Sequence, residues 1–330
     1  MTDLLVADDL TLGFTTRRDM ASLLRGGPPP KVRALNGVSF KIARGETLAV
    51  VGESGCGKST LARALVRLVD LDSGQISFDG ADVRGLKGGD LRRYNRRVQM
   101  IFQDPYGSLN PRMTIGQILI EALQVHGMAE PVRRQERVAE LLSLVLLGPD
   151  AASRLPHEFS GGQRQRIAIA RALSVEPELL IADEIVSALD VSIQAQILNL
   201  LLDLQERLGL SILFVSHDLR VVRHLAHRVA IMYLGRIVEL GTADVVFDSP
   251  RHPYTKALLR AAPVMQPPKP GAVRGPNAAA LTGELPSPLN IPAGCPFHPR
   301  CPEAFDRCSA KIPDFRIADN GRFAACHHVS

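Results

Sequence analysis

The chain has 330 residues, 45% of them hydrophobic, and a formal net charge of +5 at pH 7. This length allows one substantial α/β core with a smaller appended unit. No segment approaches the roughly 18 uninterrupted apolar residues of a membrane-spanning helix, and residues 1–9 lack the pattern of a secretory signal. We therefore expect a cytosolic or peripheral protein that forms no pore itself.

The first informative element is an apolar run, Thr47–Val51, followed directly by a full G-x-x-x-x-G-K-[ST] phosphate loop. Its glycines let successive backbone N–H groups converge on phosphate oxygens. Lys58 supplies a charge to the γ-phosphate, Ser59 offers a hydroxyl to Mg²⁺, and Thr60 can bond the α-phosphate. The residues predicted to bind a nucleoside triphosphate with magnesium are Gly52, Glu53, Ser54, Gly55, Cys56, Gly57, Lys58, Ser59 and Thr60.

The visible concentration of positive charge is a run of four arginines within residues 92–97. Such a run can contact nucleic acid or anionic lipid, but a solvated helix face is the favoured interpretation. We expect no nucleic-acid partner.

Apolar strands alternate with helical patterns along the chain, which favours a largely parallel sheet covered by helices. Residues 110–158 lack strand alternation and are predicted to form a helical insertion. The predicted strands are 47–51, 179–182, 212–215 and 229–233, and the predicted helices are 59–68, 163–173 and 192–208.

Two further motifs lie downstream of the phosphate loop. The run 178–184 is a short apolar strand that ends in Asp183 and Glu184, an arrangement suited to holding Mg²⁺ and polarising a water molecule. Before it, Ser-Gly-Gly-Gln-Arg-Gln-Arg begins at Ser160 and opens an amphipathic helix. Together these motifs resemble the ATP-binding-cassette (ABC) superfamily.

The resemblance implies a fold and a domain organisation. The expected fold is an α/β ABC-type P-loop nucleotide-binding domain with a RecA-like core, a helical signature subdomain and an antiparallel β part, followed by a small C-terminal Cys-rich unit. We expect the ATPase domain at 1–245, its helical subdomain at about 110–165, and the C-terminal region at 246–330.

The resemblance also assigns roles to residues that would otherwise pass as structural. Gln103 resembles the glutamine loop that contacts Mg²⁺ and the attacking water, His217 resembles the switch histidine, and Phe14 lies where the family places an aromatic ring over adenine. Alone, Gln103 is typical of a solvated loop and Phe14 of core packing. The implied catalytic residues are Glu184, His217 and Gln103, and the implied Mg²⁺ ligands are Ser59, Gln103 and Asp183.

In the resembled family each subunit supplies half of a site. The signature residues Ser160, Gly161, Gly162 and Gln163 cover the ATP of a second cassette, and Ser187 and Asp190 belong to the D-loop that crosses the dimer interface. The implied partners are a second ABC ATPase subunit in a heterodimer, two membrane permease subunits and an extracytoplasmic solute-binding protein. The implied location is the cytoplasmic face of the inner membrane.

The segment after the cassette indicates which branch of the ABC superfamily the chain resembles. His252-Pro253-Tyr254 resembles the motif of ATPase subunits of oligopeptide, dipeptide and nickel importers, and residues 104–112 resemble the second of their two ATPase subunits. ATP-driven import of peptides is the implied function, although the chain does not separate dipeptide, oligopeptide or nickel as cargo. Residues 263–276 have the Pro- and Gly-rich composition of a linker.

Four of the five cysteines lie near the C-terminal end of the chain, with five, six and seventeen residues between successive cysteines. Disulfides are disfavoured in a cytosolic chain, and the set suits tetrahedral Zn²⁺ or a [4Fe–4S] cluster. The resemblance favours [4Fe–4S] over zinc in a metal-binding unit at 295–326. The predicted metal ligands are Cys295, Cys301, Cys308 and Cys326.

One residue departs from the family pattern, because Ile185 replaces the proline that usually follows the acidic pair. Proline there carries no chemistry, so we expect little loss. Two competing functions are a soluble cassette ATPase acting on nucleic acid or ribosomes and a metal-binding regulator without ATPase activity. The intact Glu184 and His217 argue against the second.

Overall fold

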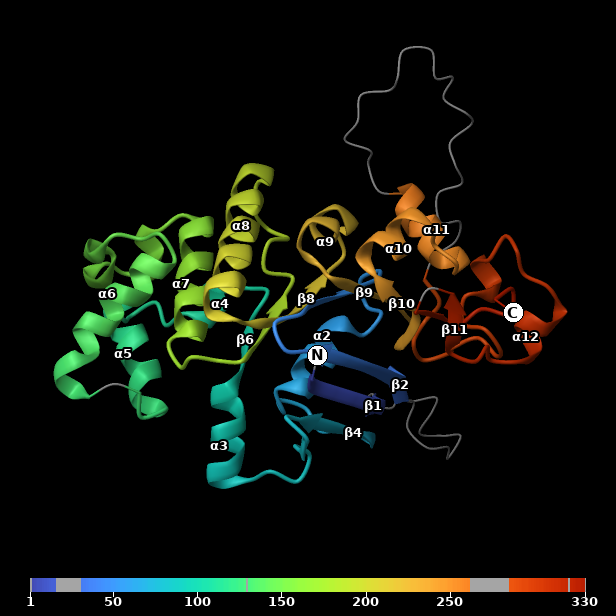
Figure 1. Ribbon diagram of the computed structural model, residues 1–330, viewed down its shortest axis with the longest axis horizontal. Helices are drawn as coiled ribbons and strands as arrows, with labels where there is room; N and C mark the ends of the chain where they lie inside the picture. The colour runs from blue at the N-terminus through green and yellow to red at the C-terminus, as the bar shows by residue number, and fades with distance from the viewer. Residues whose placement is uncertain (1, 16–30, 129, 262–284, 320, 330) are drawn as a thin grey trace, which may run out of the picture.

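The computed structural model describes residues 2–15, 31–128, 130–261, 285–319 and 321–329. Within these residues the strands form a four-stranded and an eight-stranded sheet. Figure 1 shows the helices of residues 115–208 at one end of the larger sheet and residues 285–329 at the other. The predicted linker, 263–276, lies outside the described residues.

The larger sheet carries the predicted phosphate loop, and its described strands have the order β11-β12-β10-β9-β3-β8-β7-β6. Strands β9, β3, β8, β7 and β6 run parallel. Strands β3, β7 and β8 are buried along their whole length, as expected for parallel strands covered on both faces. The strands are β3 (Thr47–Val51), β6 (Val98–Ile101), β7 (Leu179–Asp183), β8 (Ser211–Ser216), β9 (Arg228–Tyr233), β10 (Arg236–Thr242), β11 (Arg316–Asp319) and β12 (Arg322–Ala324).

The smaller sheet confirms the predicted antiparallel part. Its order is β2-β1-β4-β5, and every neighbouring pair is antiparallel. Its strands are β1 (Asp3–Thr15), β2 (Lys31–Ala43), β4 (Ser73–Phe78) and β5 (Ala81–Asp82).

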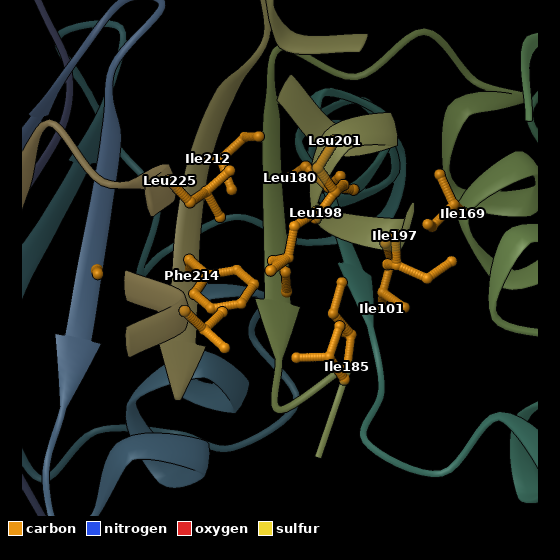
Figure 2. Packing of buried hydrophobic residues seen from close by; sticks show 14 of the residues in the cluster. Ile101, Ile169, Leu180, Ile185, Ile197, Leu198, Leu201, Ile212, Phe214 and Leu225 are labelled. Atoms are coloured by element: carbon orange, nitrogen blue, oxygen red, sulfur yellow. The ribbon is translucent and has the colours of Figure 1, made fainter. Parts of the chain in front are cut away.

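Alternate residues of the central strands face two hydrophobic cores, because successive side chains of a strand point to opposite faces. Leu48 and Val50 of β3 pack into the core that lies against the smaller sheet and helix α2 (Lys58–Leu65). Leu180 of β7 and Phe214 of β8 pack into the other core, where Figure 2 shows them beside Leu198 of helix α8 (Val191–Leu208).

Helices cover the larger sheet and form the insertion between β6 and β7. The described part of residues 110–158 contains α5, α6 and short 3-10 turns, and no strand. The helices are α2 (Lys58–Leu65), α3 (Gly88–Arg97), α4 (Pro105–Ser108), α5 (Ile115–Val125), α6 (Arg134–Leu144), α7 (Gly161–Leu173), α8 (Val191–Leu208), α9 (Leu219–Leu225), α10 (Ala243–Asp248), α11 (Pro253–Ala261) and α12 (Asp306–Ala310).

The arginine run lies on α3 and forms a solvated helix face, as predicted. Arg92, Arg93 and Arg96 are exposed. Arg97 pairs with Asp79 at 2.7 Å and with Glu178. The charges therefore cover one helix surface and in part pair within the chain.

The C-terminal segment extends the larger sheet. Strand β12 pairs with β10, with Glu239 opposite Ala324 and Leu240 opposite Phe323. Beside this pairing, Arg322 is 1% exposed and lies 3.8 Å from the Glu239 carboxylate. Arg251 and His252 donate their backbone N–H groups to the same carboxylate, at 2.8 and 3.0 Å. A buried ion pair and a strand pairing thus join this segment to the sheet.

Candidate nucleotide site

The phosphate loop connects β3 to α2, and its conformation requires glycine. Gly57 has φ of +109°, and an added Cβ would lie 2.2 Å from the carbonyl oxygen of Ala34. A Cβ on Gly52 would lie 2.2 Å from the carbonyl oxygen of Met232. Gly55 also has a positive φ, of +82°. The loop therefore takes left-handed backbone angles in close contact with β2 and β9.

Lys58 lies at the start of α2 and is held by the loop itself. Its side chain is 4% exposed, and its Nζ donates to the carbonyl oxygens of Gly52 at 2.8 Å and Glu53 at 3.1 Å. The same Nζ lies 3.8 Å from Oε1 of Glu184. The ammonium group is thus fixed between the loop and the second acid of the predicted pair.

Ser59 and Asp183 meet at the end of β7. The Ser59 hydroxyl donates to Oδ1 of Asp183 at 3.0 Å. Burial raises the pKa of Asp183 above its ordinary 3.8, and the Glu184 charge adds to the rise, while the bond from Ser59 opposes it. A buried carboxylate beside a hydroxyl is an oxygen donor set that fits Mg²⁺.

Glu184 lies at the centre of the predicted catalytic group. Gln103 donates from Nε2 to Oε2 of Glu184 at 2.9 Å, and Nδ1 of His217 lies 3.4 Å from Oε1. The φ of Glu184 is +48°, which is unusual for a residue with a Cβ and is typical of functional positions. Its N–H donates to the carbonyl oxygen of Val215 at 3.0 Å, which fixes the strained turn to β8. Next to it, Ile185 is 2% exposed and packs in the core (Figure 2).

A cavity of about 360 Å³ brings most of the predicted ATP residues together. Phe14, 44% exposed, contributes to its wall. Gly52, Glu53 and Cys56 do not line it; Cys56 is buried, which raises the pKa of its thiol. The residues around the cavity are Phe14, Val32, Ala34, Ser54, Gly55, Gly57, Lys58, Ser59, Thr60, Gln103, Glu184 and Pro288.

Three wall residues were not found by sequence reasoning: Val32, Ala34 and Pro288. Val32 and Ala34 belong to β2, and Pro288 belongs to the C-terminal region. The carbonyl oxygen of Pro288 accepts a hydrogen bond from the N–H of Arg33, at 3.3 Å. Apolar residues in a strand and a loop carry no local signal for a nucleotide site.

The signature residues lie at the start of α7, outside this cavity. Ser160 is the N-cap, and its hydroxyl accepts from the N–H of Gln163 at 3.3 Å while Oε1 of Gln163 accepts from the N–H of Ser160 at 3.0 Å. A Cβ on Gly162 would lie 2.4 Å from Ile193 Cγ2 of α8. Ser160 is exposed, and Gly161 follows it in the first turn of the helix.

The predicted D-loop residues, Ser187 and Asp190, follow Glu184 in the chain. The Ser187 hydroxyl donates to the carbonyl oxygen of Glu184 at 2.9 Å, and Asp190 is the N-cap residue of α8. Both residues are exposed. Ser187 and Asp190 are therefore accessible to solvent, whereas Ile185 and Val186, which follow Glu184, are buried.

The four tail cysteines are free thiols in one small unit. Burial raises the pKa of Cys295, Cys301 and Cys326, and the neighbouring cysteines add to each rise. Cys295 donates its N–H to the carbonyl oxygen of Cys308 at 2.8 Å. Even so, no three His, Cys, Asp or Glu side chains of the described residues converge as metal ligands. Cysteine thiols are suitable ligands for zinc or iron, but within the described residues these four do not converge as one ligand set.

None of the helices within the described residues is long and apolar enough to cross a membrane.

Comparison with known proteins gives two family matches. Residues 35–187 match the ABC transporter family, and residues 238–308 match the oligopeptide/dipeptide transporter C-terminal region. The fold is similar to cbiO1 from Clostridium perfringens, with a TM-score of 0.64, 27% identity, and coverage of 75% of this chain and 91% of that one. It is also similar to the post-hydrolysis dimer of the cassette MJ0796 bound to ADP and Pi, with a TM-score of 0.62, 26% identity, and coverage of 72% and 98%.

Curated relatives match almost the whole chain. A probable peptide ABC transporter ATP-binding protein, y4tS of Sinorhizobium fredii, is 56% identical over 90% of this chain and 83% of that protein. The oligopeptide transport ATP-binding protein AppF of Bacillus subtilis is 54% identical, over 91% and 90%. The di/tripeptide transport ATP-binding protein DppF of Pseudomonas aeruginosa is 49% identical, over 100% and 98%. The chain therefore belongs to the ATP-binding subunits of ABC transporters that carry the oligopeptide/dipeptide transporter C-terminal region.

Proposed function

We infer that the chain is the ATP-hydrolysing subunit of a peptide importer. It couples ATP binding and hydrolysis to peptide uptake through partner permease subunits. The observation that carries the reaction is Glu184, which lies on the cavity wall between Gln103, His217 and Lys58. Relatives named for peptide transport supply the cargo class.

Phosphoryl transfer to water depends on positioning and charge stabilisation. Lys58 and the N–H groups of the loop bind the phosphates. Ser59, Asp183 and Gln103 would hold Mg²⁺, which when bound neutralises phosphate charge. Glu184 accepts a proton from the attacking water. His217 contacts the Glu184 carboxylate and would in addition contact the γ-phosphate. Phe14 supplies a ring for adenine.

The cavity in one chain is half of a complete site. Ser160, Gly161, Gly162 and Gln163 lie outside it, on a face that can cover a second subunit's nucleotide. Ser187 and Asp190 lie on the surface between the two motifs. We assign the second cassette to a related ATPase subunit, so that the two form a heterodimer joined to two permeases at the cytoplasmic face of the membrane, with an extracytoplasmic solute-binding protein delivering peptide.

The ATPase domain at 1–245, its helical subdomain at 110–165 and the C-terminal region at 246–330 are the proposed functional divisions. The helical subdomain carries the signature at the start of α7. The C-terminal region carries the four cysteines.

We propose a structural [4Fe–4S] cluster on Cys295, Cys301, Cys308 and Cys326, with Zn²⁺ as the alternative. The proposal is supported by four free cysteines within 295–326, where burial and neighbouring thiols raise the pKa of Cys295, Cys301 and Cys326. A bound metal would stabilise this small unit. Anaerobic purification, iron, sulfide and zinc analysis, and visible absorption test it. A metal-free wild-type protein that keeps its thermal stability would refute it, and Cys308→Ser should lose the metal if it is correct.

Affinity purification of the tagged chain from its own membranes in mild detergent, followed by mass spectrometry, tests the assembly. Two permeases and a second cassette subunit are expected to co-elute. Recovery only from the soluble fraction with nucleic acid or ribosomal proteins would favour the competing class.

A further inference from the structure

Two residues of the C-terminal region, Tyr254 and Arg300, contact Glu53 of the phosphate loop. The Tyr254 hydroxyl accepts from the backbone N–H of Glu53 at 3.0 Å. Nη1 of Arg300 donates to both carboxylate oxygens of Glu53, each at 3.1 Å. These contacts join residues 201 and 247 positions apart in sequence. They hold both the backbone and the side chain of one loop residue.

Both contacting groups are fixed by their own surroundings. Tyr254 is fully buried, and its ring centroid lies 4.6 Å from that of Tyr233 and 5.4 Å from that of Phe297. The side chain of Arg300 is 6% exposed, and the loop that carries it also carries Phe297. A buried hydroxyl and guanidinium on a packed aromatic cluster have little freedom to follow the loop if it moves.

Glu53 in turn contacts the residue that holds the nucleotide. Its carbonyl oxygen accepts from Nζ of Lys58 at 3.1 Å, while its carboxylate does not line the cavity. A carboxylate in an anion-binding loop is unfavourable unless a cation neutralises it, and Arg300 supplies that cation. Tyr254 and Arg300 are therefore linked through Glu53 to the ammonium group of Lys58.

We propose that Tyr254 and Arg300 are positioning residues for ATP binding: through Glu53 they hold the phosphate loop in the conformation that binds triphosphate. The proposal rests on the function given above, in which this loop binds ATP. It makes nucleotide affinity depend on the C-terminal region, which does not itself carry the phosphate loop.

The first test measures the affinity of a fluorescent ATP analogue, with Mg²⁺, for the purified full chain. Tyr254→Phe keeps the ring in the aromatic cluster and removes the hydroxyl, and Arg300→Met removes the charge. Each variant should bind about three- to tenfold more weakly, the range expected for loss of one buried hydrogen bond or ion pair. Lys256→Met is the matched control, because it breaks an exposed pair with Glu303 in the same region, and its affinity should not change. Thermal unfolding of every variant checks that the fold is kept.

Glu53→Gln separates positioning from simple electrostatics. Removing a negative charge near the phosphates would tighten binding if charge alone mattered, whereas loss of a positioning contact weakens it. The double variant Glu53→Gln/Arg300→Met should bind no more weakly than Glu53→Gln, since both changes break one contact. Additive losses, or tighter binding by Glu53→Gln, would overturn the proposal.

Binding by the wild type and by the variants distinguishes the proposed function from the positioning role. If the wild-type chain does not bind the ATP analogue, the proposed function is wrong. If the wild type binds and Tyr254→Phe, Arg300→Met and Glu53→Gln all bind equally well, only the positioning role is wrong. Should Arg300→Met not fold, Tyr254→Phe alone decides, because its packing is unchanged.

Discussion

Glu184, the proposed catalytic base, shows how neighbouring elements position one side chain. Its left-handed backbone, its bond from Gln103 and its contact with His217 fix the carboxylate at the cavity wall. Glu184→Gln removes the proposed base and keeps the size of the side chain, so hydrolysis by the assembled transporter should fall at least about 100-fold while nucleotide binding persists. Steady-state phosphate release and nucleotide binding measure the two effects. The control is Glu206→Gln, an exposed acid of α8; wild-type turnover in Glu184→Gln would refute the assignment.

Asp183 predicts a pH effect on stability. Because its pKa in the folded chain is raised above 3.8, its ionised form costs folding free energy, and that cost appears as pH rises through the raised pKa. Asp183→Asn should therefore stabilise the nucleotide-free protein at pH 7 by about 1 kcal/mol, with the gain vanishing below about pH 4.

Urea unfolding at pH 7 and pH 4 measures this difference. The same variant should lose the extra stability that Mg²⁺ and ATP together give to the wild type. An Asp183→Asn chain that is less stable than wild type at pH 7 would contradict the argument.

At residue scale the sequence predicted those parts of the site that are local in the chain. The phosphate loop, Asp183 and Glu184 each depend on a few consecutive residues with a specific chemistry. Pro288 and Arg300 reach the same site from more than 200 residues away through tertiary packing. No local pattern distinguishes Pro288 and Arg300 from ordinary loop residues, so only the structure shows that they lie near the phosphate loop.

At element scale, two helices of the insertion carry the same N-terminal motif in different places. Ser160 and Gln163 form a capping box on α7, and Thr114 and Gln117 form one on α5. Each hydroxyl satisfies an N–H of the first helical turn. Only Ser160 belongs to the predicted signature.

This pair separates a structural role from a catalytic one. Ser160→Ala and Thr114→Ala should each lower the free energy of unfolding by about 1 kcal/mol. Hydrolysis by the assembled complex should fall strongly in Ser160→Ala and stay near wild type in Thr114→Ala. Equal activity in the two variants would show that Ser160 serves only as a cap.

The positions of elements were predicted well where hydrophobic periodicity is strong. The strand 47–51 matches β3, and the helices predicted at 163–173 and 192–208 end at the observed residues of α7 and α8. The addition of β11 and β12 to the larger sheet could not be predicted from the sequence. Strand β11 has only four residues, two of them exposed, and β12 has only three residues, too few to show a hydrophobic period.

At the scale of the whole molecule, the C-terminal region is joined to the cassette through the larger sheet and through the buried ion pair of Arg322 with Glu239. Arg322→Met leaves the buried Glu239 carboxylate without its cation, which should lower the free energy of unfolding by about 3 kcal/mol. Arg223→Met, which breaks an exposed pair with Asp248, is the control and should cost less than about 1 kcal/mol. Urea unfolding measures the free energy of unfolding of both variants. Equal decreases in the two would mean that the buried pair stabilises the fold no more than the exposed pair does.

Peptide uptake tests the central claim most directly. Cells lacking this chain are complemented with the wild type or with Glu184→Gln, and the initial rate of uptake of a labelled di- or oligopeptide is measured. The account predicts that uptake returns with the wild type and not with Glu184→Gln, although both proteins are present at the membrane. Uptake that is unchanged by loss of the chain, or fully restored by Glu184→Gln, would contradict it.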